Sequence, residues 1–254
     1  MLSGLTRLAT CHEFQEPYLP EAAVSEPEFD RFAASYREIH ARNIVLSGES
    51  PDYFAQYKML DFVSILHKLE APRSGKFLDF GSGIGASVLP FLDGWPKGQL
   101  ICADVSPSSI AQSLAAHGSL VEYSLIKDGR LAQADNSVDG AFACCVFHHI
   151  PESNHPSCLR ELRRVLKPGA PLMLYEHNPL NPLTVHAVRT CPLDENAVLI
   201  RAKTLRRRCE DAGFLAVRIE YRVFFPAALR RLRSLESSLR WLPFGAQYAV
   251  HARA

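Results

Sequence analysis

The 254 residues are 47% hydrophobic and 22% charged, which is ordinary for a globular protein with a full apolar core. The formal net charge of +1 argues against a protein that binds a polyanion such as DNA over a broad basic surface. No apolar run approaches the roughly 18 residues of a membrane-spanning helix, so we expect no transmembrane segment.

The N-terminal part of the chain is expected to be irregular and then helical. Residues 1–25 carry two prolines and show no periodicity, whereas between residues 26 and 70 apolar residues recur at helical spacing. The residues that mark these stripes are Phe29, Phe32, Tyr36, Phe54, Leu60, Phe62 and Leu66. Since a Pro-Arg-Ser-Gly boundary follows at 72–75, we divide the chain into a helical lid (1–74) and a main domain (75–254).

From residue 75 onward, the predicted strands and helices alternate. The expected strands cover about residues 76–80, 99–103, 120–126, 138–146 and 171–175. The expected helices between them cover about residues 84–93, 108–117 and 154–165. This alternation predicts an α/β fold with a doubly wound, mostly parallel sheet and right-handed crossovers.

The segment after residue 177 shows a different pattern. We expect a proline-rich loop at 178–192, a helix at 195–212, a strand at 215–225, an amphipathic helix at 226–241 and a strand at 246–252, which brings the sheet to seven strands. The amphipathic helix places Leu229, Leu232, Leu235 and Leu239 on one face, which we expect to pack on the sheet. Contact with a membrane surface is the alternative, because basic amphipathic helices bind such surfaces.

A glycine-rich loop follows the first predicted strand, in the sequence Phe-Leu-Asp-Phe-Gly-Ser-Gly-Ile-Gly-Ala at 77–86. Glycines at Gly81, Gly83 and Gly85 would let the backbone approach a ligand closely. Asp104 ends the second predicted strand, where a nucleotide-binding βαβ unit places the acid that binds ribose hydroxyls. This spacing also fits a dinucleotide fingerprint ending at Ala86, so the loop alone leaves the ligand open.

The cysteine pattern indicates reduced thiols. The seven cysteines are odd in number, form no C-x-x-C pair, and three of them lie in apolar runs predicted to be strands. We therefore expect neither disulfides nor a metal site, and a cytoplasmic location.

Four segments of the chain, in order and at fitting distances, resemble the motifs of class I S-adenosylmethionine-dependent methyltransferases. The subtype they resemble acts on small molecules, as ubiquinone and menaquinone methyltransferases do. The segments are Leu78–Gly85, Asp104–Ser106, Asn136–Pro151 and Leu162–Gly169. The resemblance is strong over about residues 75–176, and it implies a Rossmann-like methyltransferase fold with S-adenosylmethionine as cofactor.

The resemblance also implies a set of cofactor-binding residues. Asp79, which a dinucleotide site does not require, would lie at the methionine end together with the three glycines, and Asp104 would bind the ribose. Asp128 would lie near the adenine amino group, and Tyr36 would place an aromatic ring beside the sulfonium, a cation–π contact. The cofactor-binding set is Tyr36, Asp79, Gly81, Gly83, Gly85, Asp104, Val105, Asp128 and Cys144.

The acceptor is expected at the carboxyl ends of the fourth and fifth predicted strands, where ligands of doubly wound sheets lie. This edge carries the catalytic candidates His148, His149 and Glu176, followed by the substrate-binding candidates His177 and Asn178. The alternative for each is structural: histidines packed under a helix, and a carboxylate that anchors the loop.

The sequence thus predicts an enzyme that transfers a methyl group to an oxygen, nitrogen or carbon atom of a small-molecule or lipid-linked acceptor, and no nucleic-acid partner. Two alternatives stay open: an NAD(P)-dependent oxidoreductase, and a methyltransferase-like module that binds without turnover.

Overall fold

The computed structural model describes residues 35–254, and the side chains of Tyr36, Arg37 and Leu46 are outside that description. The predicted irregular segment 1–25 and the helical positions Phe29 and Phe32 therefore lie outside the described residues.

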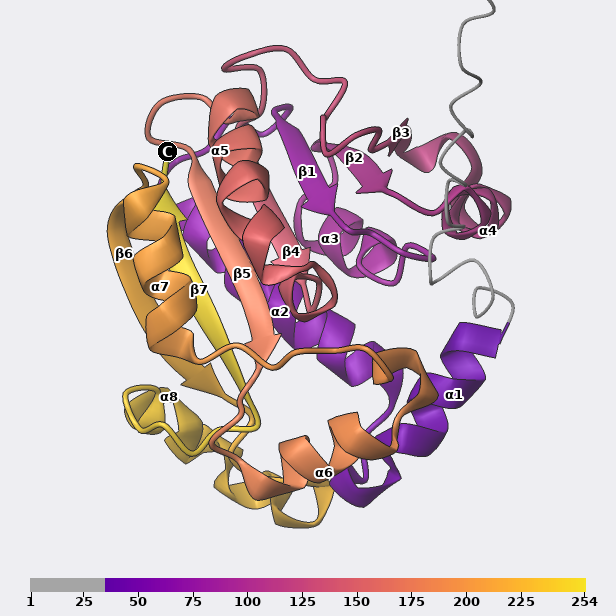
Figure 1. Ribbon diagram of the computed structural model, residues 1–254, viewed down its shortest axis with the longest axis vertical. Helices are drawn as coiled ribbons and strands as arrows, with labels where there is room; N and C mark the ends of the chain where they lie inside the picture. The colour runs from indigo at the N-terminus through magenta and orange to yellow at the C-terminus, as the bar shows by residue number, and fades with distance from the viewer. Residues whose placement is uncertain (1–34) are drawn as a thin grey trace, which may run out of the picture.

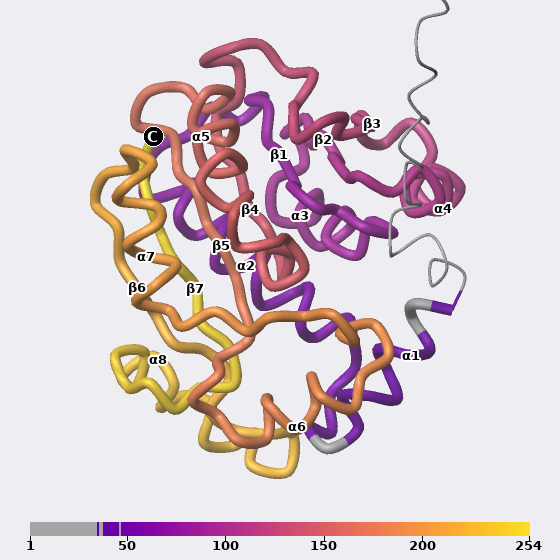
Figure 2. The backbone as a smooth tube through the Cα atoms, in the orientation of Figure 1, coloured from indigo at the N-terminus to yellow at the C-terminus, as the bar shows by residue number. Residues whose placement is uncertain are grey.

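A seven-stranded sheet forms the centre of the fold (Figure 1). Its strands are β1 Lys76–Phe80, β2 Gln99–Asp104, β3 Glu122–Leu125, β4 Gly140–Cys144, β5 Pro171–His177, β6 Leu215–Arg222 and β7 Gln247–Arg253. They lie in the order β3-β2-β1-β4-β5-β7-β6; β1 to β5 are parallel, and β7 is antiparallel to both of its neighbours. The predicted doubly wound, mostly parallel sheet is confirmed. The chain winds outward in both directions from β1 and β4 (Figure 2).

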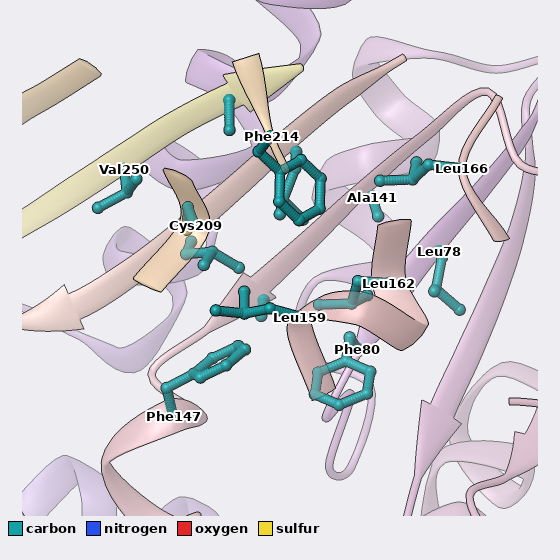
Figure 3. Packing of buried hydrophobic residues seen from close by; sticks show 14 of the residues in the cluster. Leu78, Phe80, Ala141, Phe147, Leu159, Leu162, Leu166, Cys209, Phe214 and Val250 are labelled. Atoms are coloured by element: carbon teal, nitrogen blue, oxygen red, sulfur yellow. The ribbon is translucent and has the colours of Figure 1, made fainter. Parts of the chain in front are cut away.

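Helices cover both faces of the sheet, because successive strand residues point to opposite faces. On one face, Phe77 packs with side chains of α2 Pro51–Lys68 and α3 Val88–Gly94. On the other, Leu78 and Phe80 belong to a cluster with α5 His155–Val165 and α7 Ala202–Asp211 (Figure 3). The remaining helix of this core, α4 Pro107–His117, packs against β2 and β3.

Short helices connect these elements. They are α1 Tyr36–Asn43, η3 Val45–Ser47, η4 Gly118–Leu120, η5 Phe147–His149, η6 Glu152–Asn154, α6 Pro182–Thr190, η7 Pro192–Asp194, η8 Ala227–Leu235 and α8 Glu236–Leu239. Among residues 35–254, none of the helices is both long and apolar enough to cross a membrane.

The structure differs from the predicted elements in three places before the tail. The helix expected at 84–93 begins only at Val88, because residues 81–87 form turns around the glycines. The loop expected at 178–192 contains α6, since Pro182 occupies the first helical turn and the Asn181 side chain accepts the Thr184 N–H as an N-cap. The helix expected at 195–212 begins at Ala202.

The tail helix does not bury its leucine face, so that prediction is wrong. Leu229, Leu232 and Leu235 are 48%, 41% and 53% exposed. Polar contacts hold the segment instead: the Glu236 carboxylate accepts two backbone N–H groups at 3.1 and 3.0 Å, and Arg233 pairs with Glu49. The apolar residues of η8 thus remain on the surface.

Candidate functional site

Polar residues gather at the carboxyl edge of the sheet, where β1 and β4 lie side by side and the chain winds away in opposite directions. Asp79 is in β1, Asp104 ends β2, and Cys144 ends β4. Glu176 and His177 end β5. Because these strands are parallel, their ends meet at one edge, which is where such sheets bind ligands.

The three predicted glycines serve different purposes in the loop after β1. All have a positive φ, of +73° at Gly81, +52° at Gly83 and +82° at Gly85. A Cβ on Gly81 would lie 2.6 Å from the Val146 side chain, and one on Gly85 would meet Ser113 and His117 of α4. Only at Gly83 would a Cβ enter open space, so Gly83 is the glycine of the three at which a ligand can approach the backbone.

Asp79 is a buried carboxylate with no hydrogen-bond partner among the described residues. It is 1% exposed, and neither oxygen accepts a hydrogen bond within residues 35–254. Burial and, after it, the nearby Asp104 raise the pKa of Asp79 from 3.8 to about 8. Since a buried carboxylate is stabilised by an opposite charge, this position suits a cationic ligand group.

Asp104 holds the glycine loop. One carboxylate oxygen accepts the Gly83 N–H at 2.7 Å, and the other accepts the Ser106 N–H at 2.9 Å. The next residue, Val105, exposes 50% of its surface, which makes it an apolar surface next to Asp104 that a ligand ring can cover.

The other predicted cofactor residues have different surroundings. Tyr36 begins α1, but its side chain is outside the described part of the structure. Cys144 packs against the cluster of α2 and α3, and burial raises the pKa of its thiol, which keeps it neutral.

Asp128 occupies an exposed turn. Lys127 and Arg130 pair through their backbones, and Asp128 and Gly129 between them both have positive φ. Consecutive residues with positive φ are the signature of a tight hairpin turn, a conformation that Asp and Gly favour. The turn is one reason for Asp128 at this position, and its contact with an adenine stays a prediction.

Glu176 is an anchor in the structure, where the sequence suggested a catalytic group. It is 1% exposed, and one oxygen accepts the N–H groups of Val146 and Phe147 at 3.1 and 2.7 Å. The other oxygen lies 2.5 Å from Nδ1 of His148. Because both oxygens are engaged within the protein, Glu176 positions the loop after β4 and orients His148.

His148 and His149 come together with Asp194 of η7. Their rings lie 4.1 Å apart, and Nε2 of each is 3.4 Å from Oδ1 of Asp194. Burial lowers the pKa of His148, but Glu176 and Asp194 outweigh burial and bring it to about 10. Burial and the neighbouring His148 lower the pKa of His149 to about 3. Sequence analysis missed Asp194, which lies in a segment where no motif marked it.

His177 and Asn178 are neighbours in the chain but have different contacts. The ring of His177 meets that of His148 edge-on, with centroids 5.1 Å apart, and so borders the candidate acceptor site. Asn178 is 1% exposed; its amide donates to the carbonyls of Pro243 and Gly245, and its oxygen accepts the Leu180 N–H. Asn178 therefore ties two loops together and is not free to bind substrate.

Lys58 and Cys145 also lie at this edge, although nothing in the sequence indicates that they are in contact. Lys58 of α2 is 6% exposed, and its ammonium donates to Sγ of Cys145 at 3.3 Å. Burial raises the pKa of Cys145, but Lys58 and His177 outweigh burial and lower it to about 7. Cys145 also has a φ of +60°, which is rare outside glycine.

Comparison with known families identifies the central part of this domain. The family model described as "Methyltransferase domain" matches residues 78–174, which run from the glycine loop through β5. A search of curated proteins finds no match.

Solved structures share the fold at low sequence identity. A putative methyltransferase of Haloferax volcanii, in complex with the Trm112 methyltransferase activator, has a TM-score of 0.63 at 19% identity and covers 89% of this chain and 97% of its own. A possible histamine N-methyltransferase of Thermotoga maritima has a TM-score of 0.61 at 18% identity and covers 89% and 97%. A Haemonchus contortus phosphoethanolamine N-methyltransferase with bound S-adenosylmethionine has a TM-score of 0.58 at 18% identity and covers 88% and 57%.

The site fits the cofactor of this family. S-adenosylmethionine carries an ammonium and a sulfonium, and these positive charges match the Asp79 carboxylate, which has no hydrogen-bond partner within residues 35–254. The antiparallel β7 between β5 and β6 also departs from the all-parallel order 3-2-1-4-5-6 of dinucleotide-binding dehydrogenases. Residues 78–174 are therefore a methyltransferase domain, in a fold shared with solved S-adenosylmethionine-dependent methyltransferases, and S-adenosylmethionine is the cofactor that this site fits.

Proposed function

We propose that the protein transfers a methyl group from S-adenosylmethionine to an oxygen, nitrogen or carbon atom of a small-molecule or lipid-linked acceptor. The binding of S-adenosylmethionine is supported by Asp79. This buried carboxylate has no hydrogen-bond partner in the described residues, and the open backbone at Gly83 follows it in the loop.

Each cofactor-binding residue has a proposed role. Asp79 holds the methionyl ammonium, Gly83 lets that end approach the backbone, and Asp104 accepts the ribose hydroxyls. Val105 covers one face of the adenine.

The chain's task on the acceptor side is orientation. When bound, the cofactor supplies a methyl group on a sulfonium, a leaving group that needs no further activation. The protein then has to align the acceptor and exclude water, and orientation of this kind is worth about 7–11 kcal/mol.

A surface hollow supports a small-molecule acceptor. It has a volume of about 380 Å³ and lies between α1 and α6, with Ile39, Arg42, His186 and Pro192 in its lining. This volume falls in the range of small-molecule sites. Because α1 forms one wall, movement of the proposed lid would open or close the hollow.

The surface of η8 supports a lipid-linked acceptor. The exposed leucines of η8 are accompanied by Trp241 and Phe244, which are 74% and 67% exposed, and by the exposed Arg230 and Arg231. Apolar side chains with arginines beside them are typical of segments that lie on anionic membranes. We expect the chain to co-sediment with anionic vesicles more than with neutral ones. The Leu232→Glu variant should lose that difference, and equal sedimentation would remove the argument for a lipid surface.

The cysteines support a reducing compartment, and on that basis we propose a cytoplasmic location. The six cysteines within residues 35–254 are all free thiols.

The test of the function has a binding arm and a product arm. Calorimetry should show binding of S-adenosylmethionine and no response to NADH, and Asp104→Ala should weaken the affinity for S-adenosylmethionine at least about tenfold through lost hydroxyl contacts. Mass spectrometry of small molecules released by denaturing the purified protein should identify acceptor candidates, which are then assayed for methylation. NADH binding alone would support the oxidoreductase, whereas cofactor binding without turnover of any acceptor would support the silent module.

A further inference from the structure

Three side chains at the acceptor edge of the sheet face a common point. His148 and His149 come from η5, and Asp194 comes from η7, 45 residues later in the chain. Nε2 of each histidine lies 3.4 Å from Oδ1 of Asp194, and ligand atoms of all three residues lie within 4.8 Å of one another.

Hydrogen bonds within residues 35–254 do not account for the position of Nε2 of His148. Glu176 lies 2.5 Å from Nδ1 of His148 and holds a proton there, which leaves Nε2 to face Asp194. That nitrogen makes no hydrogen bond among the described residues although the side chain is only 1% exposed. At 3.4 Å it lies outside the usual N–H···O range of about 2.7–3.2 Å. A buried ring nitrogen turned toward a carboxylate needs a positive charge between them, either a proton on the ring or a metal ion.

The spacing of the three residues fits a metal ion. Nitrogen and oxygen ligands bind zinc at about 2.0–2.2 Å, so two ligands at the tetrahedral angle are about 3.3–3.5 Å apart. The two separations of 3.4 Å match that value, and both share the same oxygen of Asp194. An ion between the three residues would replace two long polar contacts with three coordinate bonds.

The donor set selects the class of metal. Two imidazole nitrogens and one carboxylate oxygen suit zinc, iron, manganese or cobalt, whereas magnesium and calcium prefer oxygen ligands alone. Glu176 on the far nitrogen of His148 forms the carboxylate–histidine pair that orients metal-binding imidazoles. Together, Glu176 and Asp194 supply two negative charges that a divalent ion balances.

We propose that His148, His149 and Asp194 bind one divalent transition-metal ion, with Glu176 as the residue that positions His148. Three protein ligands leave at least one coordination position open, as in catalytic metal sites. If the proposed function holds, the open position faces the acceptor edge and can take an acceptor oxygen. The metal site itself does not depend on that function.

Metal binding can be tested without any turnover. The full chain is freed of metal with a chelator and then titrated with Zn²⁺ and Co²⁺, with calorimetry and visible absorption as readouts. We expect one ion per chain. The bound Co²⁺ should show d–d bands but no thiolate charge-transfer band, because the site contains no cysteine.

Variants locate the ion. His149→Gln and Asp194→Asn should each weaken binding at least about 10–100-fold, the loss typical even of outer residues at metal sites. His67→Gln and Asp211→Asn, exposed residues of α2 and α7, are matched controls that should bind as the wild type does. Circular dichroism confirms that each variant is folded.

Two results would overturn the metal site. One is a folded wild-type chain that takes up no Zn²⁺ or Co²⁺ at one equivalent, which would mean that a proton on His148 fills the cluster. The other is metal binding that His149→Gln and Asp194→Asn leave unchanged. Affinity for S-adenosylmethionine, measured on the metal-free chain, separates either result from a failure of the proposed function.

Discussion

The protonation of Asp79 should couple cofactor binding to pH. Burial, followed by the nearby Asp104, raises the pKa of this carboxyl from 3.8 to about 8. At pH 7 the ligand-free protein therefore keeps a proton on about nine-tenths of its Asp79 side chains. Under the proposed function the methionyl ammonium lies beside Asp79, and that positive charge favours the ionised carboxylate.

The size of the effect follows from this pKa. Binding at pH 7 should release about 0.9 proton from Asp79, and the affinity should rise about ninefold between pH 6 and pH 7. The ligand-free protein should show the opposite trend in stability. Its native state keeps a proton that the unfolded chain loses near pH 3.8, so the free energy of unfolding falls by roughly 1.4 kcal/mol per pH unit as pH rises toward 8.

Calorimetry measures the proton directly. Titration of S-adenosylmethionine in two buffers that differ in ionisation enthalpy gives the number of protons released. Asp79→Asn should reduce that number to near zero and remove the pH dependence of affinity, whereas Asp211→Asn, an exposed acid on α7, should change neither. A wild-type protein that binds the cofactor without releasing protons, or an Asp79→Asn variant that still releases them, would refute the reasoning.

Three further substitutions test the site and its supports. Gly81→Ala should lower the free energy of unfolding by about 2–4 kcal/mol in urea, through its positive φ and its contact with a valine side chain, whereas Gly83→Ala should cost only about 1–2 kcal/mol; equal losses would contradict the different surroundings of the two glycines. Asp128→Asn should leave cofactor affinity within about twofold by calorimetry, and a larger loss would return this residue to the site. Glu176→Gln should destabilise the protein by about 3–5 kcal/mol in thermal or urea unfolding, because it breaks a buried ion pair; an unchanged stability would show that the pair is not needed as an anchor.

The sheet could be predicted from the sequence because its signals are local. The strand predicted at 76–80 is confirmed at those residues, and each of the other strands is found within its predicted range or within two residues of it. A parallel strand buried on both faces is a short apolar run, and such a run is visible in the sequence without knowledge of its neighbours. The glycine loop and its two acids are part of the same short pattern.

The predicted elements differ from the structure where the same residue pattern is compatible with two kinds of local structure. Pro182 suggests a loop from the sequence alone, but a proline in the first turn of a helix is favourable, and here Asn181 caps that helix. The leucine face of η8 was expected to be buried, since amphipathic spacing usually marks a core face. Nothing in the spacing says whether a partner surface exists in the same chain.

The acceptor edge could be predicted only in part. His148 and His149 stood out because they follow an apolar strand. Asp194 and Lys58 reach the same edge from segments far away in sequence, through η7 and α2, and neither segment carries a motif. Long-range contacts of this kind follow from the packing of the whole fold, which no local pattern records.

The position of β7 has a consequence for synthesis on the ribosome. This strand follows all the others in the chain, yet it lies between β5 and β6 in the sheet. Until Gln247–Arg253 has left the exit tunnel, the hydrogen-bonding groups of β5 and β6 that face each other across this gap have no partner. Unpaired strand edges recruit other chains, so nascent protein should depend on chaperones until translation passes this strand, and products that stop before Gln247 should aggregate.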